Sequence, residues 1–442
     1  MNSVAIALFT RDLRVRDNPM LAAAAAHTQI VPLFVIDEAM IAGPHACANR
    51  RGFLTESLVD LDVSLREMGS WLVVRSGDWI GETLKVAQDV GATVIHLARD
   101  YSATAQRRLS ALTELAASVG IEVIAHDGVT VLAPGAVRPG SGTEFKVFTP
   151  YYNRWRDHPW RPMVAKPNGL RSPACDSLLD SLPAAEMQSP YRAKGGESIA
   201  LSHLKSWTRR LADYETNHND LAADATSRIA PYLHFGCLSP LEVAVRLRER
   251  DGAAPFVRQL CWRDFYHQIL NERPEVAHRD FRDRGDSWNI DPQGFATWSD
   301  GHSGFPIVDA AMRQLKAEGF MHNRARMIVA SFLTKDLYID WRLGARHFMD
   351  WLVDGDVANN QLNWQWVAGT GSDTNPNRIF NPLRQAERFD PHGDYTRRYV
   401  VELAELAAPL IHNPDAQTRL RLGYPDPIVD HHEAIAAYRA RS

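Results

Sequence analysis

Residues 93–125, TVIHLARDYSATAQRRLSALTELAASVGIEVIA, contain one complete strand–helix–strand pattern. Thr93–Leu97 and Ile121–Ala125 are apolar runs of strand length, and residues 102–119 between them place apolar side chains at helical spacing. Two neighbouring strands that are joined through a helix run parallel, and the helix covers one face of their sheet. This segment therefore predicts a parallel sheet with helices packed on it.

The same alternation occupies the region before this segment. Further strands are predicted at Val4–Phe9, Ile30–Asp37 and Trp71–Val74, and further helices at residues 16–27, 50–68 and 80–90. Repeated strand–helix units predict a doubly wound parallel sheet, so residues 1–130 are expected to form an α/β domain. No GxGxxG motif follows the first strand, which argues against ordinary dinucleotide binding.

Two different patterns follow the α/β region. Residues 131–200 are rich in glycine and proline and predict a long irregular linker. Apolar residues at i, i+3 and i+4 then recur in residues 202–215, 238–250, 254–270, 305–319, 323–341 and 345–358. Residues 201–442 are therefore expected to form an all-α domain.

The composition narrows the classes of function. With 442 residues, 45% of them hydrophobic, and a formal net charge of −4, the chain is an ordinary globular protein and not a uniformly basic nucleic-acid coat. The four cysteines form no CxxC or Cys/His cluster, which argues against a zinc site and fits a reducing, cytoplasmic location. The first apolar run, VAIALF, is too short for a signal sequence, and no apolar run of about 18 residues predicts a membrane span.

Residues 354–366, DGDVANNQLNWQW, combine Asp and Asn side chains with two tryptophans. Buried polar side chains need partners, so this segment predicts a site for a polar ligand, with a cluster of capping and turn residues as the alternative. A calcium loop is disfavoured, because its twelfth position, counted from Asp354, is Gln365 rather than a glutamate. Upstream, residues 226–228, Thr-Ser-Arg, stand where helical periodicity resumes and are either a phosphate-binding helix start or an ordinary cap.

Four segments together resemble the cryptochrome/photolyase family. They are LFTRDLRVRDNPML (8–21), RQLCWRDFYHQIL (258–270), FPIVDAAMRQLKAEGFMHNRARMIVASFLTKDLYIDWRLG (305–344) and DGDVANNQLNWQWVAGTGSDTNPNRIFNP (354–382). They follow the family's order of an α/β antenna domain, a long linker and a helical FAD domain, and the helical part resembles that of class I cyclobutane pyrimidine dimer (CPD) photolyases. The resemblance implies a light-driven DNA repair enzyme, a carbon–carbon lyase, in which photoexcited reduced FAD passes an electron to a dimer flipped out of UV-damaged DNA.

The resemblance also assigns FAD-binding residues by motif position. They are Tyr214, Thr226, Ser227, Arg228, Ile229, Ala230, Arg326, Asp354, Gly355, Asp356 and Asn360. Asp354 is expected to pair with Arg326. Asp356 is expected to accept a hydrogen bond from the flavin ring edge, and Asn360 to face the flavin N5. A neutral amide at N5 can accept a hydrogen bond without opposing the negative charge of the reduced flavin, as a carboxylate would.

The family's electron-transfer chain and lesion contacts can be placed in the same way. Trp364, Trp341 and Trp288 match the chain from the flavin outward, with core packing as the alternative for any single tryptophan. The implied lesion and DNA contacts are Gln259, Trp262, Arg263, Tyr266, Asn323, Arg324, Met327, Trp366 and His218. A basic face for DNA phosphates is expected from Arg258, Arg263, Arg324, Arg378, Arg384, Arg397 and Arg398, and scattered, solvated arginines are the alternative.

Two lesion-site positions depart from the best-known CPD enzymes. Gln259 stands where glutamate is usual, and glutamine is also seen there in (6-4) photolyases. Asn323 and Met327 stand where (6-4) enzymes have a histidine-bearing motif, so CPD repair is expected and (6-4) repair is the alternative. His218 replaces a basic residue and is a weaker phosphate ligand when neutral.

Two positions bear on the antenna pigment, and others bear on the choice between repair and light reception. Gln106 stands where folate-binding relatives have a glutamate, and Asp100 where deazaflavin-binding relatives have an aspartate. The expected antenna is therefore 8-hydroxy-5-deazaflavin, with methenyltetrahydrofolate as the alternative. The family also implies a monomer without a metal. A blue-light receptor of the same fold is the rival class, and retention of Trp262, Met327 and Trp366 favours repair.

Overall fold

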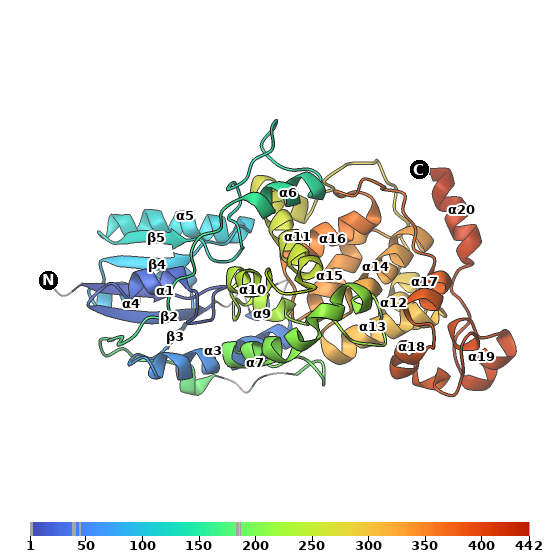
Figure 1. Ribbon diagram of the computed structural model, residues 1–442, viewed down its shortest axis with the longest axis horizontal. Coiled ribbons are helices and arrows are strands. Elements are labelled where there is room, and N and C mark those ends of the chain that lie inside the picture. Colours follow the sequence, from blue (N-terminus) through green and yellow to red (C-terminus); the bar gives the residue numbers. More distant parts are fainter. Residues whose placement is uncertain (1–2, 38–40, 44–45, 183–184, 186, 442) are drawn as a thin grey trace. The chain divides into compact units, whose positions relative to one another are not determined.

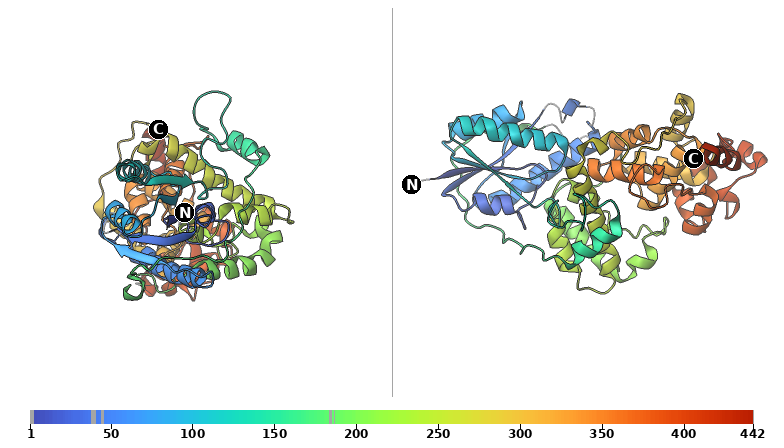
Figure 2. Two further views of the ribbon diagram at one scale, coloured as in Figure 1. Left: turned by 90° about the vertical axis from the view of Figure 1, so that its left-hand side faces the viewer. Right: turned by 90° about the horizontal axis from the view of Figure 1, so that it is seen from above.

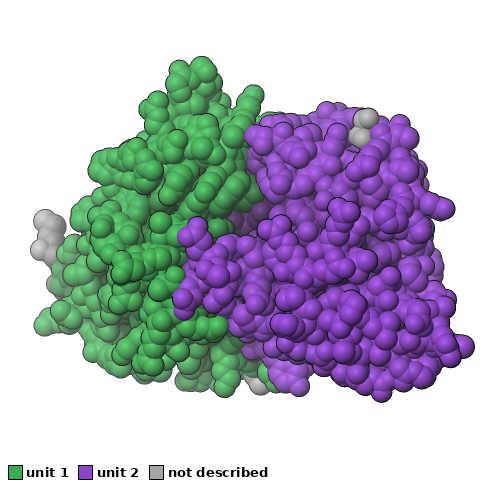
Figure 3. Space-filling model, turned by 45° about the vertical axis from the view of Figure 1, so that its right-hand side comes forward, with its two compact units in different colours: residues 1–187, 193–212, 227–274 green, residues 188–192, 213–226, 275–442 purple. Residues whose placement is uncertain are grey.

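The computed structural model describes residues 3–37, 41–43, 46–182, 185 and 187–441. Its residues group into two compact units, which are coloured separately in Figure 3. Unit 1 consists of residues 1–187, 193–212 and 227–274, and unit 2 consists of residues 188–192, 213–226 and 275–442. The division predicted at residues 130 and 200 follows the sequence pattern instead of this grouping, and it stays a prediction.

Unit 1 contains a five-stranded parallel sheet in the order β3-β2-β1-β4-β5. The strands are β1 (Val4–Leu8), β2 (Gln29–Ile36), β3 (Val73–Ser76), β4 (Val94–Ala98) and β5 (Glu122–His126), shown at the blue end of the ribbon in Figure 1. Ile6 of the central strand pairs with Val31 of β2 on one side and with Ile95 of β4 on the other. The predicted doubly wound parallel sheet is confirmed.

Helices cover the sheet because its side chains alternate between two faces. These helices are α1 (Pro19–Ala24), α3 (Ala48–Arg66), α4 (Trp79–Asp89) and α5 (Ala103–Ser118), of which Figure 2 gives two further views. Ile6 and Leu8 share a buried cluster with Trp79 of α4 and Leu112 of α5. Ala5 has the opposite orientation, and α1 packs against β1, β4 and β5. Both faces of the central strand are therefore buried.

The later helices of unit 1 include one that the sequence did not predict. They are α6 (Phe148–Asp157), α7 (Glu197–Trp207), α9 (Ala230–His234), α10 (Pro240–Leu247) and α11 (Ala253–Glu272). Helix α6 lies inside residues 131–200, so the expectation of a wholly irregular linker is wrong there. Pro150 was taken as a breaker, but it stands in the first turn, where its missing N–H costs nothing. Phe148, Tyr151 and Trp155 are the buried residues of this helix.

A buried carboxylate ties the linker to α11. Asp264 accepts hydrogen bonds from the backbone nitrogens of Val131 (3.2 Å) and Leu132 (2.9 Å) and from Nε1 of Trp155 (2.8 Å). Burial raises the pKa of Asp264 to about 6, although these donors lower it. The start of the linker and helix α6 are therefore held to α11 within unit 1.

Unit 2 is helical throughout the part that the structure describes, apart from one isolated bridge between Asn289 and Ile339. Its helices are α8 (Tyr214–Asn217), α12 (Pro292–Asp300), α13 (Pro306–Glu318), α14 (Asn323–Ser331), the π-helical turn η4 (Phe332–Asp336), α15 (Trp341–Trp351), α16 (Val357–Ala368), α17 (Pro382–Phe389), α18 (Asp394–Tyr399), α19 (Ala416–Leu422) and α20 (His431–Arg441). Short 3-10 turns of the chain are η1 (Leu179–Ser181), η2 (Thr208–Asp213), η3 (Pro274–Ala277), η5 (Val401–Leu403) and η6 (Leu410–His412). The prediction of helices without strands is confirmed here.

Two predicted helices of unit 2 are each broken. The predicted helix over residues 323–341 ends after η4, where Tyr338 has φ 52°, and Asp340 then caps α15 by accepting from Arg342 N. The predicted helix over residues 345–358 stops at Trp351, and Asp356 caps α16. In both cases an aspartate at the N-cap satisfies backbone donors that a continuous helix would bond internally.

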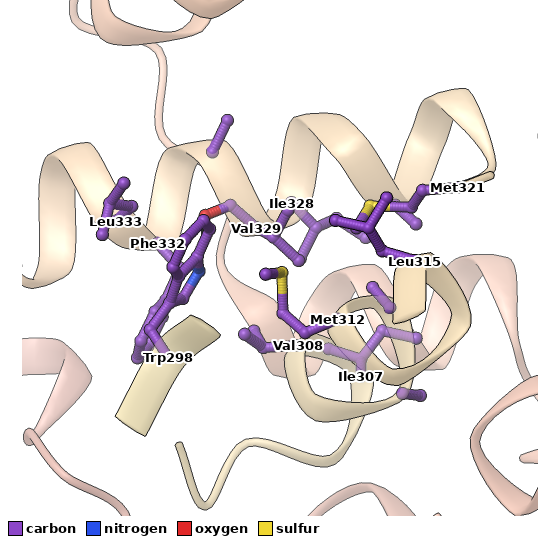
Figure 4. Close-up of a cluster of buried hydrophobic side chains, with 14 of the residues drawn as sticks. Trp298, Ile307, Val308, Met312, Leu315, Met321, Ile328, Val329, Phe332 and Leu333 are labelled. Atoms are coloured by element: carbon purple, nitrogen blue, oxygen red, sulfur yellow. The ribbon is translucent and has the colours of Figure 1, made fainter. Parts of the chain in front are cut away.

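Part of the core of unit 2 is shown in Figure 4. Side chains of α13 and α14 meet there, and the indole of Trp298 donates from Nε1 to the carbonyl of Val329 at 3.2 Å. Among the helices described, none is long and apolar enough to cross a membrane.

Candidate active site

Helix α16 carries three of the predicted site residues along one side. Asp356 at its N-cap, Asn360 and Trp364 are four residues apart, so they follow one another along the helix axis. Their exposed fractions are 4%, 8% and 3%. A carboxylate, an amide and an indole therefore form a buried stripe, which we call the α16 stripe.

The start of α16 combines a cap with an ion pair. Asp356 Oδ1 accepts hydrogen bonds from the backbone nitrogen (2.9 Å) and the side-chain nitrogen (2.7 Å) of Asn359. The predicted pairing of Asp354 with Arg326 is confirmed, because Nη2 of Arg326 lies 3.0 and 3.2 Å from the two carboxylate oxygens. Gly355, between the two aspartates, is buried. Asp356 therefore caps the helix, as the alternative of a capping cluster predicted. This role is compatible with a ligand site at the same turn.

Asn360 is held by its amide nitrogen. Nδ2 donates to the carbonyl of Ala345 in α15 at 2.9 Å and to Oε1 of Gln361 at 3.3 Å. The amide oxygen has no hydrogen-bond partner among the residues that the structure describes. This orientation makes the oxygen the atom of Asn360 that can accept a hydrogen bond from a ligand.

Trp364 is fixed by close packing and keeps a polar atom without a partner. Its ring centre lies 4.9 Å from that of Phe348 and 6.2 Å from that of Trp298. A Cβ on Gly344 of α15 would lie 2.2 Å from the ring, so only glycine fits there. The buried Nε1 has no hydrogen-bond partner in the described structure. Such an orphaned donor costs about 1–3 kcal/mol, so it suits a ligand or a water molecule.

The other two tryptophans of the predicted chain also belong to unit 2. Trp341 is fully buried and donates from Nε1 to Oδ1 of Asp280 at 2.8 Å. The guanidinium carbon of Arg342 lies 4.9 Å from its ring centre, and Arg342 Nη2 binds the same carboxylate oxygen at 2.8 Å. Trp288 is half-buried, with its ring centre 4.9 Å from that of Tyr338. Burial thus decreases from Trp364 and Trp341 to Trp288, as a chain that ends near the surface requires.

Gln365 is a structural residue that sequence reasoning passed over. It is fully buried, and its Nε2 donates to the carbonyls of Val276 (2.7 Å) and Arg279 (3.1 Å). Its Oε1 accepts from the backbone nitrogen of Phe281 at 2.7 Å. The amide therefore fastens residues 276–281 to the helix that carries the α16 stripe. A glutamine between two tryptophans was the available signal, since a buried amide must be fully bonded.

The predicted FAD-binding positions before α9 fall in both units, and Tyr214 and Thr226 belong to unit 2. Burial raises the pKa of Tyr214 to about 12, and its ring centre lies 5.0 Å from that of His218. Oγ1 of Thr226 is buried and, within the described residues, has no hydrogen-bond partner. This hydroxyl is a second orphaned polar atom that a ligand could satisfy.

The unit 1 members are Ser227, Arg228, Ile229 and Ala230, at the start of α9. The predicted helix start is confirmed, because α9 begins at Ala230. Arg228 has φ 49°, in the left-handed region that side-chain residues rarely adopt and that often marks functional sites. The carbonyl of Ser227 lies 2.7 Å from Nε2 of His203, and Ile229 is buried.

Several predicted lesion contacts belong to unit 2 and combine apolar and basic groups. Asn323 is exposed, and its Nδ2 lies 4.0 Å from the sulfur of Met327. Trp366 is half-buried, and the guanidinium carbon of Arg378 lies 5.2 Å from its ring centre. An indole with one arginine against it resembles the stacking platforms that bind bases.

Arg324 belongs to a cluster of arginines. It donates to Oδ1 of Asn219 at 2.9 and 3.2 Å, while Nδ2 of Asn219 lies 3.0 Å from Nε2 of His218. Burial lowers the pKa of Arg324, and the like charges of Arg388 and Arg378 lower it further. Arginines that repel one another are a suitable place for a phosphate. Arg388 was not among the predicted contacts.

The predicted lesion contacts of unit 1 differ in exposure along α11. Gln259 is exposed and Trp262 is half-buried, with the Trp262 ring stacked on Phe148 at a centre distance of 3.7 Å and an angle of 3°. Arg263 and Tyr266 are 8% and 2% exposed, and Arg263 donates to a backbone carbonyl at 2.6 Å. The contacts expected of Arg263 and Tyr266 stay predictions.

Among the remaining predicted phosphate contacts, one arginine is bonded within the protein and four are exposed. Arg397 donates to the backbone carbonyls of His392, Ala404 and Leu406, which is a local structural role. Exposed side chains remain at Arg258, Arg378, Arg384 and Arg398. Arg258 belongs to unit 1 and the other three to unit 2, and the basic face stays a prediction.

The predicted antenna residue lies at the carboxyl end of the sheet. Asp100 follows β4 and pairs with Arg11, which follows β1, at 3.2 Å. The strand order changes direction between β1 and β4, and ligands of doubly wound sheets bind outside the carboxyl ends at such a point. Gln106 donates to the carbonyl of Tyr101 at 3.0 Å.

Comparisons with known proteins agree with this architecture. Residues 5–168 match the family model described as DNA photolyase, and residues 256–442 match the model described as the FAD binding domain of DNA photolyase. The chain is 50% identical to the deoxyribodipyrimidine photo-lyase of Streptomyces griseus over 452 residues, with 99% of each chain covered.

Two solved structures are similar over the whole chain. A class III photolyase from Agrobacterium tumefaciens has a TM-score of 0.92 and 34% identity, with 100% of this chain and 97% of that chain covered. The cryptochrome of Synechocystis sp. has a TM-score of 0.91 and 29% identity, with 100% and 99% covered. The chain therefore belongs to the DNA photolyase family. Similarity to a class III photolyase does not confirm the predicted assignment to class I.

Proposed function

We propose that this chain is a deoxyribodipyrimidine photo-lyase, an enzyme that uses light to split cyclobutane pyrimidine dimers in UV-damaged DNA. The observation that carries the proposal is the α16 stripe of Asp356, Asn360 and Trp364, which lies inside the segment that matches the FAD binding domain. When bound, FAD supplies light absorption and one-electron transfer. The protein's own residues bind it, orient it and hold the lesion.

The polar groups of the α16 region fit a flavin. Nε1 of Trp364 and Oγ1 of Thr226 are buried polar atoms without a hydrogen-bond partner in the described structure, and the amide oxygen of Asn360 is an acceptor that the bonds of its Nδ2 leave available. A flavin nucleotide offers donors and acceptors along its ring edge, ribityl chain and phosphates. Within unit 2 we assign the ring edge to Asp356, the N5 edge to Asn360, and the phosphates to Tyr214 and Thr226.

The role of Asn360 can be tested by adding a charge. Asn360→Asp keeps the shape of the side chain but places a carboxylate where reduced flavin carries negative charge, so we expect a loss of reduced-state stability on the order of a few kcal/mol. A redox titration of the bound flavin measures this directly. Asn363→Asp, at an exposed position of the same helix, is the matched control. An unchanged potential in Asn360→Asp would remove the N5 assignment.

The electron-transfer role of Trp364, Trp341 and Trp288 predicts a separation of two activities. Replacing any of the three with Phe should slow photoreduction of oxidised flavin while sparing repair by enzyme that has been reduced chemically. Trp298→Phe is the control, since Trp298 is fully buried and its ring centre lies 6.2 Å from that of Trp364. An equal loss in the Trp298 variant would contradict the assigned chain.

Substrate choice is tested with defined oligonucleotides. Under reducing conditions and blue light, we expect repair of a CPD and no repair of a (6-4) product. Repair of the (6-4) product alone would assign the alternative lesion. Repair of neither by reduced, FAD-loaded protein would favour the blue-light receptor.

The lesion wall is tested at Trp366. Trp366→Ala should weaken binding of CPD-containing DNA by about 1–3 kcal/mol, the usual worth of one base stacked on an aromatic ring. Trp366→Phe should restore most of it. Trp351→Ala, another half-buried tryptophan of unit 2, is the matched control. Equal affinity of the Trp366→Ala variant and the wild type would place the lesion elsewhere.

The antenna pigment and the photolyase class are two further assignments. We propose 8-hydroxy-5-deazaflavin as the antenna, supported by Asp100 and its partner Arg11 at the carboxyl ends of β4 and β1. Reconstitution with this pigment should fail in Asp100→Ala, and methenyltetrahydrofolate should not bind. Binding of the folate alone would reverse the assignment. Class I is proposed from the motifs of the helical domain, with class III as the alternative.

A further inference from the structure

Trp288 and Tyr338 of unit 2 form an aromatic pair at the outer end of the proposed tryptophan chain. Their ring centres are 4.9 Å apart and their planes are inclined by 39°. Trp288 is half-buried, whereas Tyr338 is 5% exposed. Rings in van der Waals contact can exchange an electron directly, so Tyr338 is placed to reduce an oxidised Trp288.

The backbone holds this pair in position. Asn289 donates from its backbone nitrogen to the carbonyl of Tyr338 at 2.8 Å and from its side chain to the carbonyl of Leu337 at 2.9 Å. Asn289 and Ile339 also form an isolated parallel bridge. Tyr338 has φ 52°, a left-handed conformation that is unfavourable for a tyrosine and persists only because the surrounding structure imposes it.

The phenol of Tyr338 has a proton acceptor. Its hydroxyl donates to Oδ1 of Asp286 at 2.9 Å. The second oxygen of Asp286, Oδ2, is buried and has no hydrogen-bond partner among the described residues. Burial and the neighbouring carboxylate raise the pKa of Tyr338 to about 12, so the phenol keeps its proton at neutral pH until it is oxidised.

A cation on the ring decides the form that an oxidised Tyr338 can take. The guanidinium carbon of Arg441 lies 4.4 Å from the centre of the Tyr338 ring. A positive charge at this distance opposes a second positive charge on the ring. Oxidation of Tyr338 must therefore be accompanied by loss of its proton.

We propose that Tyr338 is the terminal electron donor of the tryptophan chain and that Asp286 accepts its proton. One electron passes from Tyr338 to the radical cation of Trp288, the phenol O–H bond breaks, and the proton moves to the Asp286 carboxylate. The products are neutral Trp288, a neutral tyrosyl radical and a neutral carboxylic acid, so the summed charge of the three groups is zero before and after. This inference rests on the proposed electron-transfer role of Trp288.

The tyrosyl radical is the first observable. In the flavin-loaded full chain, a laser flash without added reductant should give a tyrosyl radical, detected by time-resolved electron paramagnetic resonance and identified by ring-deuterated tyrosine. Tyr338→Phe keeps the ring and removes the hydroxyl, so this signal should be lost and a tryptophanyl radical should persist. Asp286→Asn should slow formation of the tyrosyl radical. Heavy water should slow it in the wild type.

Tyr399→Phe is the matched control. Tyr399 also donates its hydroxyl to a carboxylate, that of Glu318, but its ring packs against Tyr395, with a centre distance of 5.1 Å, instead of against Trp288. Removal of the Tyr399 hydroxyl should leave the tyrosyl radical signal unchanged. Loss of the signal in Tyr399→Phe and its survival in Tyr338→Phe would overturn the inference.

A dark measurement separates this inference from the proposed function. Azide radicals made by pulse radiolysis oxidise tryptophan without exciting the flavin, and a subsequent transfer from tyrosine to tryptophan should occur in the wild type but disappear in Tyr338→Phe and in Trp288→Phe. If light-driven photoreduction survives in Trp288→Phe, the tryptophan chain is wrong, yet this dark transfer still tests the pair. A dark transfer that is unchanged in Tyr338→Phe would reject Tyr338 as the donor.

Discussion

Two buried clusters, one around the sheet of unit 1 and one in unit 2, differ in composition. The cluster around the sheet of unit 1 is made mainly of Val, Ile, Leu and Ala side chains from the strands and their helices, with Trp79 packed among them. The core of unit 2 contains Trp298, Trp341 and Trp364 together with phenylalanines, tyrosines and methionines. Polar side chains such as Gln365 and Asn360 are buried in the same unit.

The difference in composition reflects different requirements on the two clusters. A parallel sheet is covered on both faces and is stabilised by apolar area alone, so aliphatic side chains are sufficient. A core that presents polar atoms to a ligand must also bond every other buried polar atom internally. We therefore expect the unit 2 cluster to respond more strongly to the loss of single polar groups, and the sheet of unit 1 to respond mainly to changes in volume.

The largest effect is expected at Gln365. Gln365→Leu conserves volume but leaves the carbonyls of Val276 and Arg279 and the nitrogen of Phe281 without their partner, which should cost roughly 3 kcal/mol or more. Ile6→Val in the sheet is the comparison and should cost about 1 kcal/mol. Denaturant unfolding of both variants measures the difference. Equal losses would remove the distinction between the two cores.

A pH effect of nearly the same size is expected at Glu197 of unit 1. Glu197 is 5% exposed and accepts from the backbone nitrogens of Val15 (2.8 Å) and Arg16 (3.1 Å), and burial raises its pKa from 4.5 to about 7. The folded state therefore keeps a proton that the unfolded state has lost. Its contribution to stability is complete below about pH 4.5 and is lost as the pH rises through about 7, a change on the order of 3 kcal/mol.

Glu197→Gln tests this directly. The variant should lose less stability than the wild type between pH 4.5 and 8, because the side chain no longer titrates. Denaturant unfolding at several pH values gives both curves. Parallel curves for the two proteins would show that Glu197 does not cause the dependence.

A smaller effect on stability is expected at Gly344. Gly344→Ala adds a methyl group that would lie 2.2 Å from the Trp364 ring, so the ring or helix must shift at a cost of about 1–3 kcal/mol. The displaced indole should also change photoreduction. Gly140→Ala, where no atom lies within 4 Å of the added carbon, is the control and should be near neutral. A stable Gly344→Ala variant with unchanged photoreduction would show that the contact is not critical.

The sequence predicted regular elements better than it predicted their interruptions. The strands could be predicted because a run of apolar residues is a local feature of the sequence. Each end of every predicted strand lies within two residues of the observed end. The ends of helices at residues 337–340 and 352–356 were missed, because Asp340 and Asp356 act as caps only when the preceding backbone turns away. Helix α6 was missed because Pro150 was weighed as a breaker without knowing its position in the first turn.

At the candidate site, too, local features were predicted from the sequence and long-range ones were not. Spacing alone puts Asp356, Asn360 and Trp364 on one side of a helix, and the motif paired Asp354 with Arg326 as the structure confirms. Exposure could not be read in this way, and the sequence did not predict that Arg263 and Tyr266 are buried. The bonds of Gln365 reach residues more than eighty positions away, and no local pattern could reveal them.

By itself, the sequence determined the order of strands and helices, the residue types at the site and their spacing along each helix, because these depend on neighbours along the chain. Only the tertiary structure decided which polar atoms are satisfied internally and which remain for a ligand, and that Tyr338 packs against Trp288 and donates to Asp286. Hydrogen bonding and burial depend on groups that are distant in sequence, so they are settled only when the chain has packed.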